Sequence, residues 1–181
     1  MSALIEAAKA PDYPAEIVGV LSNKAGAAGL EVAAAEGIAT ASLAQSKFPS
    51  RDMFEDVMTQ VLESWDTEIV CLAGFMRILG PDFVEHWSGR MINIHPSLLP
   101  LYKGLDTHAR ALADGAKEHG CTVHFVTPGL DEGTPILAAR VPVLPGDTAE
   151  TLAARVLVEE HRIYPEALRM LALGQVAISG S

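Results

Sequence analysis

Short apolar runs alternate with helical patterns along the whole chain, and this alternation restricts the fold more than any other feature. The runs Ile17–Leu21 and Ile69–Ala73 are continuous and contain several β-branched residues, as is typical of strands that are buried on both faces of a sheet. Helical patterns follow them at Ala27–Glu36 and Pro81–Trp87. We therefore predict an α/β fold, a doubly wound and mostly parallel sheet with helices on both faces.

The remaining elements continue the same alternation. Arg51–Trp65 has apolar residues at helical spacing, and Thr148–Leu173 is predicted to be one long helix that is interrupted near Pro165. Gln175–Ile178 is expected to begin a closing strand, and Ser179–Ser181 to be a frayed end. With 181 residues and no internal repeat or linker, we expect a single domain over residues 1–181. The other predicted elements are the strands Thr40–Ser42, Arg90–Ile94, Thr122–Val126 and Ile136–Val143 and the helix Thr107–Asp114.

The chain opens with a helical pattern, Met1–Lys9, where a doubly wound domain normally opens with a strand. Because right-handed crossovers join parallel neighbours, a helix ahead of the Ile17–Leu21 strand should itself follow a strand. We therefore expect a sheet that lacks its first strand, with a vacant central position beside Ile17–Leu21. We also expect the carboxyl end to be short.

Composition and charge exclude several classes of protein. A chain that is 49% hydrophobic and 20% charged can bury a sizeable core, which excludes disordered, collagen-like and disulfide-scaffold proteins. The net charge of −10, without a local basic patch, argues against a nucleic-acid partner. No apolar stretch approaches the ~20 residues that span a bilayer, and no signal-peptide pattern opens the chain. With Cys71 and Cys121 as isolated thiols, we expect a cytoplasmic protein that has no membrane partner.

The densest chemical signal is the segment from Asn93 to Pro100. Asn93 and His95 are two residues apart at the end of a predicted strand, so their side chains point to the same face, and Pro96 ends the strand there. An amide beside an imidazole can stabilise a developing oxyanion, and the imidazole can also move protons. A capped strand end with a hydrogen-bonded core histidine explains the same residues equally well.

Asp131, in a glycine-flanked loop after the Thr122–Val126 strand, is the natural third member, because a carboxylate near His95 would orient its ring. Plain turn chemistry is the alternative, and periodicity alone cannot bring Asp131 to His95. His119 and His124 are separated by an odd number of residues, so they face opposite ways on a regular strand, and we expect no metal site. His108 is expected to be a surface or capping residue.

The loop Gly74–Leu79 follows a buried strand and places apolar side chains and Arg77 at the carboxyl edge of the sheet. Such a surface suits a flat aromatic ligand with an anionic tail. For Ile78 and Leu79, packing on the next helix is the alternative, and a solvated helix start is the alternative for Arg51. Dinucleotide-binding, P-loop and nucleophile-elbow glycine motifs do not occur in the sequence.

Several segments together resemble the folate-dependent formyltransferases. The run Asn93–Pro100, followed by Gly104 and Thr107–His108, is similar to the first half of the signature of that family. The second half is similar to His119–Val126 with Asp131–Gly133. Leu72–Leu79 and Glu159–Pro165 match as well, so the resemblance covers almost the whole chain.

The resemblance implies transfer of a formyl group from 10-formyltetrahydrofolate, a co-substrate, to the amino group of glycinamide ribonucleotide in purine biosynthesis. It implies no metal, and it leaves the oligomeric state open. In the family, a first strand and a glycine-rich loop that holds the substrate phosphate precede the position of Met1. The residues implied are the catalytic trio Asn93, His95 and Asp131, the folate-binding positions Arg51, Met76, Arg77, Ile78, Leu79, Val126 and Leu130, and Glu160 near the substrate amine.

Three other functions compete with this interpretation. A formyltetrahydrofolate deformylase has the same trio and directs water to the formyl group, but it has an added regulatory domain and usually a second histidine where Pro96 stands. A methionyl-tRNA formyltransferase needs a further RNA-binding domain and a basic surface. A non-catalytic folate- or nucleotide-binding module would not need the intact trio.

Overall fold

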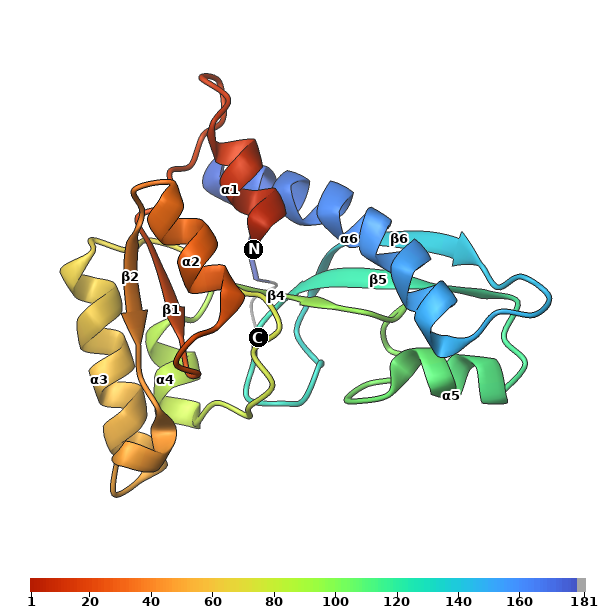
Figure 1. The fold of residues 1–181 in the computed structure, drawn as a ribbon, viewed down its shortest axis with the longest axis horizontal. Helices are drawn as coiled ribbons and strands as arrows, with labels where there is room; N and C mark the ends of the chain where they lie inside the picture. The colour runs from red at the N-terminus through yellow and green to blue at the C-terminus, as the bar shows by residue number, and fades with distance from the viewer. Residues whose placement is uncertain (179–181) are drawn as a thin grey trace.

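The computed structural model describes residues 1–178, which form six helices, six strands and a short 3₁₀ helix (Figure 1). The helices are α1 Ser2–Ala8, α2 Ala28–Ala35, α3 Arg51–Ser64, α4 Pro81–His86, α5 Thr107–Ala113 and α6 Ala149–Ala172, and the 3₁₀ helix is Gln45–Lys47. The strands are β1 Gly19–Ser22, β2 Ala39–Ser42, β3 Val70–Leu72, β4 Met91–His95, β5 Glu118–Phe125 and β6 Pro135–Pro142. Each predicted helix and strand up to α6 is present, and β5 begins four residues earlier than expected.

Helices lie on both faces of the strands, which confirms the α/β class (Figure 1). The first apolar core, which includes Leu152, Val156 and Leu168 of α6, packs on one face, where α1 also lies. The second core, which includes Phe54 and Met58 of α3, packs on the other face together with α4. The periodicity of α3 and α6 therefore predicts correctly which side chains are buried.

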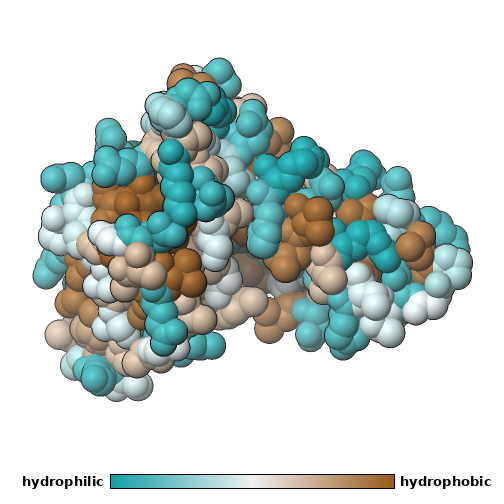
Figure 2. Space-filling model, turned by 45° about the horizontal axis from the view of Figure 1, so that its top comes forward, coloured by the Kyte–Doolittle hydropathy of each residue, from teal (hydrophilic) through white to brown (hydrophobic). Residues whose placement is uncertain are grey.

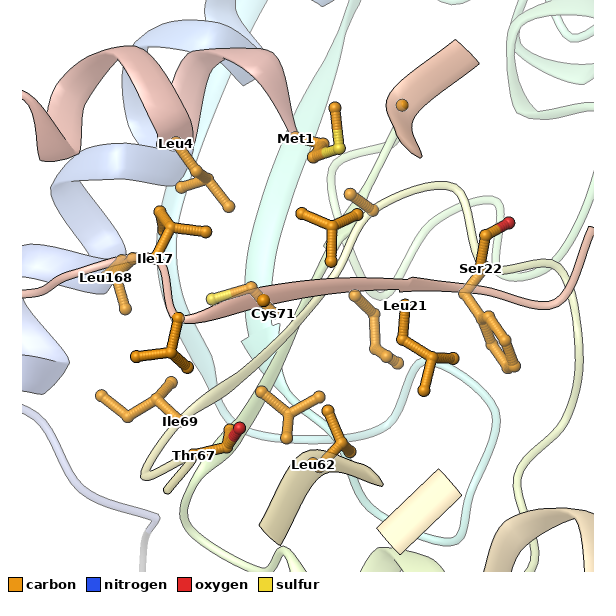
Figure 3. A pocket seen from close by; sticks show the side chains of 18 of the residues that line it. Met1, Leu4, Ile17, Leu21, Ser22, Leu62, Thr67, Ile69, Cys71 and Leu168 are labelled. Atoms are coloured by element: carbon orange, nitrogen blue, oxygen red, sulfur yellow. The ribbon is translucent and has the colours of Figure 1, made fainter. Parts of the chain in front are cut away.

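The strands of residues 1–178 form two sheets. β1 pairs with β2 in parallel, and the second sheet has the order β3-β4-β5-β6. Within it β3 and β4 are parallel, whereas β4–β5 and β5–β6 are antiparallel. In the described part of the chain, β1 and β3 each have one hydrogen-bonded neighbour, and a groove lies between them (Figure 3). The expected vacant position beside Ile17–Leu21 stays a prediction.

The expected burial of the first and third strands is wrong. All residues of β1 and β3 are half-buried, and Val18 is 38% exposed. Met91 and Ile92 of β4, by contrast, are fully buried. The physical reason is the groove, because no strand of residues 1–178 packs against the side of β1 and β3 that faces it.

Two expectations for the carboxyl-terminal part are also wrong. α6 continues through Pro165 without interruption, because Ile163, Tyr164 and Leu168 around it are buried in the core. The Tyr164 hydroxyl also donates to the Leu72 carbonyl at 2.7 Å, which fixes the helix to β3. Residues 175–178 form no strand, and the expected frayed end at Ser179–Ser181 lies outside the described residues.

None of the helices in residues 1–178 combines the length and the apolar character that crossing a lipid bilayer requires.

Candidate active site

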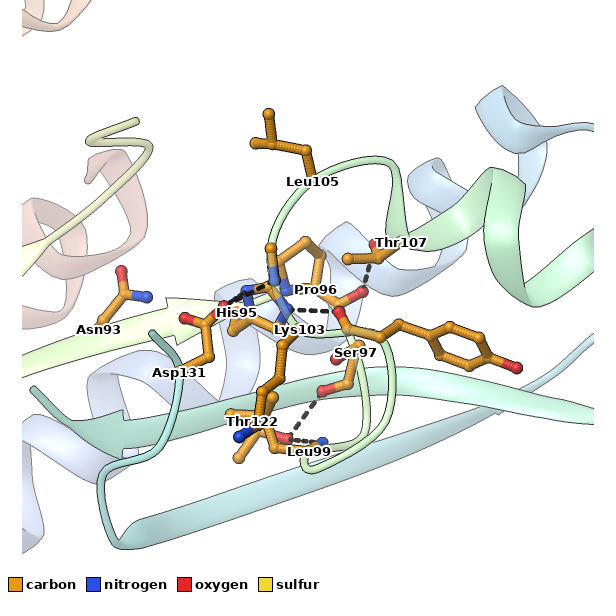
Figure 4. A network of polar contacts seen from close by, with 12 residues as sticks. Asn93, His95, Pro96, Ser97, Leu99, Lys103, Leu105, Thr107, Thr122 and Asp131 are labelled. Carbon is orange, nitrogen blue, oxygen red and sulfur yellow. Dashed lines mark hydrogen bonds and ion pairs between the residues drawn. The ribbon is translucent and has the colours of Figure 1, made fainter. Parts of the chain in front are cut away.

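The carboxyl end of β4 carries Asn93 and His95 on one face, as their spacing predicts (Figure 4). Opposite them on β5, Asn93 is in register with His124, and His95 with Thr122. Pro96 ends the strand, because it has no N–H for the ladder, and its carbonyl accepts a hydrogen bond from Thr107 Oγ1 at 2.7 Å.

Thr122 holds the loop that follows β4. Its hydroxyl donates to the carbonyl of Ser97 at 2.8 Å and accepts the Leu99 N–H at 3.1 Å. Because both bonds link β5 to the segment directly after His95, they fix the chain as it leaves the site (Figure 4).

Asp131 reaches this site through the loop that follows β5. The loop turns tightly against the strand, since a Cβ on Gly133 would lie 1.7 Å from the Phe125 carbonyl oxygen and only glycine fits. Asp131 itself has a left-handed φ of 51°, and its Oδ2 accepts the Gly104 N–H at 2.9 Å. The same Oδ2 lies 3.4 Å from His95 Nδ1, so the fold brings the three predicted residues together.

The two ring nitrogens of His95 face different acceptors. Nε2 lies 2.9 Å from the Tyr102 carbonyl oxygen, and because a carbonyl only accepts, this nitrogen carries a proton. Nδ1 faces the Asp131 carboxylate. Both side chains are buried, with 7% and 10% exposure. A ring placed between two acceptors can gain and lose a proton on Nδ1 without changing its orientation, which suits a proton shuttle.

His124 belongs to the same site, although its role was not predicted. Its Nδ1 donates to the Phe125 carbonyl at 2.8 Å, which leaves Nε2 as the acceptor for Asn93 Nδ2 at 3.3 Å. Burial lowers the pKa of His124, which favours this neutral form. His124 Nε2 also lies 3.6 Å from Asp131 Oδ1. Only the β4–β5 register reveals this partnership, and a single sequence does not give that register.

The expectation for His108 is wrong. His108 Nδ1 lies 3.1 Å from Nε2 of His119, a fully buried residue of β5, because α5 lies close to that strand (Figure 1). Burial and the neighbouring His108 lower the pKa of His119 to about 4. His119 and His124 thus take part in separate contacts. Within residues 1–178, no three His, Cys, Asp or Glu side chains gather at metal-binding spacing.

The predicted ligand-lining loop leaves large apolar side chains in solvent. Met76 is 76% exposed and Ile78 70%, and Leu130, in the loop after β5, is 53% exposed. Arg77 is exposed beside Met76. Figure 2 shows apolar residues gathered around a hollow between the lobe of α2, α3 and α4 and the arm of β5, β6 and α5. Exposed apolar side chains near a polar cluster are typical of a ligand site.

The other predicted folate-binding residues lie in different surroundings. Leu79 is buried in the second core, so its side chain packs against the protein. The Val126 N–H donates to the Met91 carbonyl at 2.9 Å, which extends the β4–β5 sheet to the start of the site loop. Arg51 begins α3 with its Nε 3.7 Å from Oε1 of Glu55, a buried carboxylate that accepts the Gly80 N–H.

Glu160, the predicted substrate-binding residue, lies half-buried on α6. Burial raises the pKa of its carboxyl group. The hydrogen bonds and ion pairs around His95 include neither Glu160 nor Arg51, so their roles stay predictions.

Known proteins resemble this chain over nearly its whole length. The family described as Formyl transferase matches residues 1–168. The phosphoribosylglycinamide formyltransferase of Escherichia coli is 47% identical over 97% of this chain and 83% of its own length. A crystal structure of the phosphoribosylglycinamide formyltransferase from Brucella melitensis is 54% identical, with a TM-score of 0.92, over 99% of this chain and 92% of that one.

Some relatives are much longer than this chain. The trifunctional purine biosynthetic protein adenosine-3 of Bos taurus is 48% identical over 98% of this chain, which spans only 18% of that relative.

Proposed function

Because the chain belongs to the formyl transferase family, we propose that it transfers a formyl group from 10-formyltetrahydrofolate to the amino group of glycinamide ribonucleotide. This reaction belongs to purine biosynthesis, the process in the name of its longer relatives. The observation that carries the proposal is the meeting of Asn93, His95 and Asp131 at the end of β4, with Asp131 Oδ2 3.4 Å from His95 Nδ1.

The site supplies what the chemistry needs. The amine nitrogen attacks the formyl carbon, and negative charge grows on the formyl oxygen. The Asn93 N–H that is not bonded to His124 donates to this oxygen. The His95 ring stabilises the charge when it is protonated between Asp131 and the Tyr102 carbonyl. The bond from the formyl carbon to the folate nitrogen then breaks. The attacking amine loses one proton and the folate nitrogen gains one, a transfer for which His95 and Asp131 are placed. Positioning of the two substrates contributes the rest.

The folate ring lies, in this proposal, against the exposed apolar side chains of Met76, Ile78 and Leu130 and the backbone between Val126 and Leu130. Arg77 and Arg51 attract the anionic tail, and the backbone beside Leu79 completes the pocket. A structure with a bound antifolate tests this arrangement. A pteridine-like ring distant from Arg77 and Leu130 would contradict it.

Glu160 serves the substrate amine, and its raised pKa suits a carboxyl group near that position. We also propose a cytoplasmic location, which is compatible with the free thiols of Cys71 and Cys121. Both substrates are small molecules, and the proposed reaction requires neither a nucleic acid nor a membrane.

A coupled assay tests the function. Tetrahydrofolate release is followed with 10-formyltetrahydrofolate in the presence and absence of glycinamide ribonucleotide, and the formylated product is identified by mass spectrometry. We expect release that depends on the ribonucleotide and an equal yield of formylated product. Release without the ribonucleotide indicates a deformylase, and folate binding without any release indicates a binding module.

A further inference from the structure

Residues 102–105 form a loop between β4 and α5 whose backbone bonds two of the three proposed catalytic side chains. The Tyr102 carbonyl accepts the proton of His95 Nε2 at 2.9 Å. The Gly104 N–H donates to Asp131 Oδ2, also at 2.9 Å (Figure 4). The orientation of the imidazole and of the carboxylate therefore depends on the shape of the 102–105 loop.

The backbone of the 102–105 loop has an unfavourable conformation. Tyr102 has a φ of 53°, and Asp106, directly after the loop, has a φ of 56°. A residue with a side chain pays an energetic cost in this left-handed region and stays there only when neighbouring contacts hold it. Gly104 has a φ of 77°, which glycine adopts without that cost. The loop therefore needs contacts that keep its Tyr102 carbonyl and its Gly104 N–H directed at the site.

Arg110, an exposed residue of α5, makes several such contacts. Its Nη1 donates to the Lys103 carbonyl at 2.7 Å and to the Leu105 carbonyl at 3.2 Å. Its guanidinium carbon lies 5.6 Å from the centre of the Tyr102 ring, within the range of a cation–π contact. One side chain thus contacts three of the four residues of the loop.

The bond from Arg110 to Lys103 acts on Asp131 through one peptide group. The Lys103 carbonyl and the Gly104 N–H belong to the same planar peptide, so a donor that fixes the oxygen also fixes the direction of the N–H. A positively charged donor on that oxygen polarises the peptide, which strengthens the bond from its N–H to Asp131 Oδ2.

Other side chains hold the chain next to the loop. Ser97 Oγ donates to the carbonyl of Leu101, directly before the loop, and Thr107 Oγ1 donates to the carbonyl of Pro96. These two bonds fix the segments that flank residues 102–105. The two carbonyls bonded by Arg110 lie within the loop itself.

We propose that Arg110 is a positioning residue for formyl transfer. It acts on His95 and Asp131 through the backbone of residues 102–104, and the bonds that it makes go to the loop carbonyls. This role rests on the proposed function, which assigns the proton transfer to His95 and Asp131.

Arg110→Met tests the proposal, because it removes the guanidinium and keeps an unbranched apolar side chain. Arg140→Met is the matched control, since Arg140 is an exposed arginine of β6 whose ion pair with Glu118 lies outside the site. Arg110→Lys keeps the positive charge on a shorter side chain without the planar guanidinium. Because both arginines are exposed, we expect the melting temperatures of these variants to agree.

The first measurement is amide hydrogen exchange by NMR. We expect the Gly104 amide to exchange at least about tenfold faster in Arg110→Met than in Arg140→Met. The resonance of the His95 Nε2 proton should broaden in Arg110→Met, because the Tyr102 carbonyl no longer holds a fixed position.

The second measurement is steady-state formyl transfer. Arg110→Met should lower kcat about tenfold and change the KM values of both substrates by less than about twofold, since the loop positions the reacting groups. Arg110→Lys should recover part of the loss in kcat and part of the Gly104 protection.

Equal exchange of the Gly104 amide in Arg110→Met and Arg140→Met would overturn the proposal. Faster exchange with an unchanged kcat would overturn it as well, because the position of the loop would then not affect the reaction. Hydrogen exchange does not depend on turnover. A parent chain without formyl transfer therefore refutes the proposed function, whereas the exchange of Gly104 shows separately whether Arg110 holds the loop.

Discussion

β3 and β4 lie side by side with similar apolar sequences, yet their surroundings differ. Met91 and Ile92 of β4 are fully buried, whereas Val70, Cys71 and Leu72 of β3 are half-buried. In the described part of the chain, β4 is paired on both edges and β3 on one. This difference distinguishes two regions of the molecule. In the first, β4 and β5 form a paired ladder that positions the polar trio Asn93, His95 and Asp131. In the second, an open groove lies beside β1 and β3. The reactive side chains of Asn93 and His95 lie on β4, whereas β1 and β3 border the groove.

The largest effect is expected in the β4–β5 region. Asn93→Ala removes a hydrogen-bond donor to the formyl oxygen and should lower kcat by about 10²–10³-fold. His95→Ala should be at least as damaging, and Asp131→Ala also severe, because the ring loses its orienting carboxylate. Steady-state formyl transfer measures these effects. Near-parent turnover in all three variants would show that the trio is not catalytic.

Leu157→Ala is the matched control for these variants, since Leu157 is an exposed residue of α6. We expect it to leave both kcat and the melting temperature unchanged.

The next effect concerns the groove. A strand and glycine-rich loop fused ahead of Met1 should tighten binding of glycinamide ribonucleotide at least about tenfold, because backbone N–H groups of such a loop can hold the substrate phosphate. Binding of a folate analogue should change far less, since Leu130 and the polar trio Asn93, His95 and Asp131 do not line the groove. Isothermal titration calorimetry compares the two ligands. An equal gain in affinity for both ligands would contradict the distinction between the two regions.

A smaller effect is expected at His124. His124→Phe removes the acceptor that orients Asn93 and should lower kcat by about tenfold at most, since one hydrogen bond contributes about 0.5–1.5 kcal/mol. His124→Gln, which can keep an acceptor near the same place, should recover part of this loss. If both variants lower kcat by the same factor, the orientation of Asn93 has another cause.

The smallest effect is on stability at low pH. The pKa of His119 is lowered from 6.5 to about 4, so between these values the unfolded chain binds more protons than the folded one. The free energy of unfolding should therefore fall as the pH drops from about 6.5 to 4. His119→Phe should flatten this part of the profile in urea denaturation. An unchanged slope would show that other groups cause it.

Much of the fold could be predicted from the sequence, because periodicity records which face of an element is buried. Arg51–Trp65 is an example, since its apolar spacing anticipates α3 and the burial of Phe54 and Met58. Pro165 shows the limit, because the packing of α6 outweighs a helix breaker. The half-exposure of β3 could not be predicted, since it depends on what lies beside the strand.

The candidate site, too, could be predicted only in part from the sequence. The spacing of Asn93 and His95 predicts that they share a face, but Asp131 and His124 reach them only through the loop after β5 and the β4–β5 register. These are long-range contacts that no local pattern encodes. The pairing of His108 with His119 was missed for the same reason.

The most direct test of the separation between the two regions is a double comparison of kcat and KM. Asn93→Ala is introduced with and without the fused strand, and formyl transfer is measured at saturating 10-formyltetrahydrofolate. We predict that Asn93→Ala lowers kcat by the same factor in both backgrounds and that the strand lowers only the KM for the ribonucleotide. A strand that restores the turnover of Asn93→Ala, or a parent chain that turns over only when the strand is present even at saturating ribonucleotide, would contradict the account.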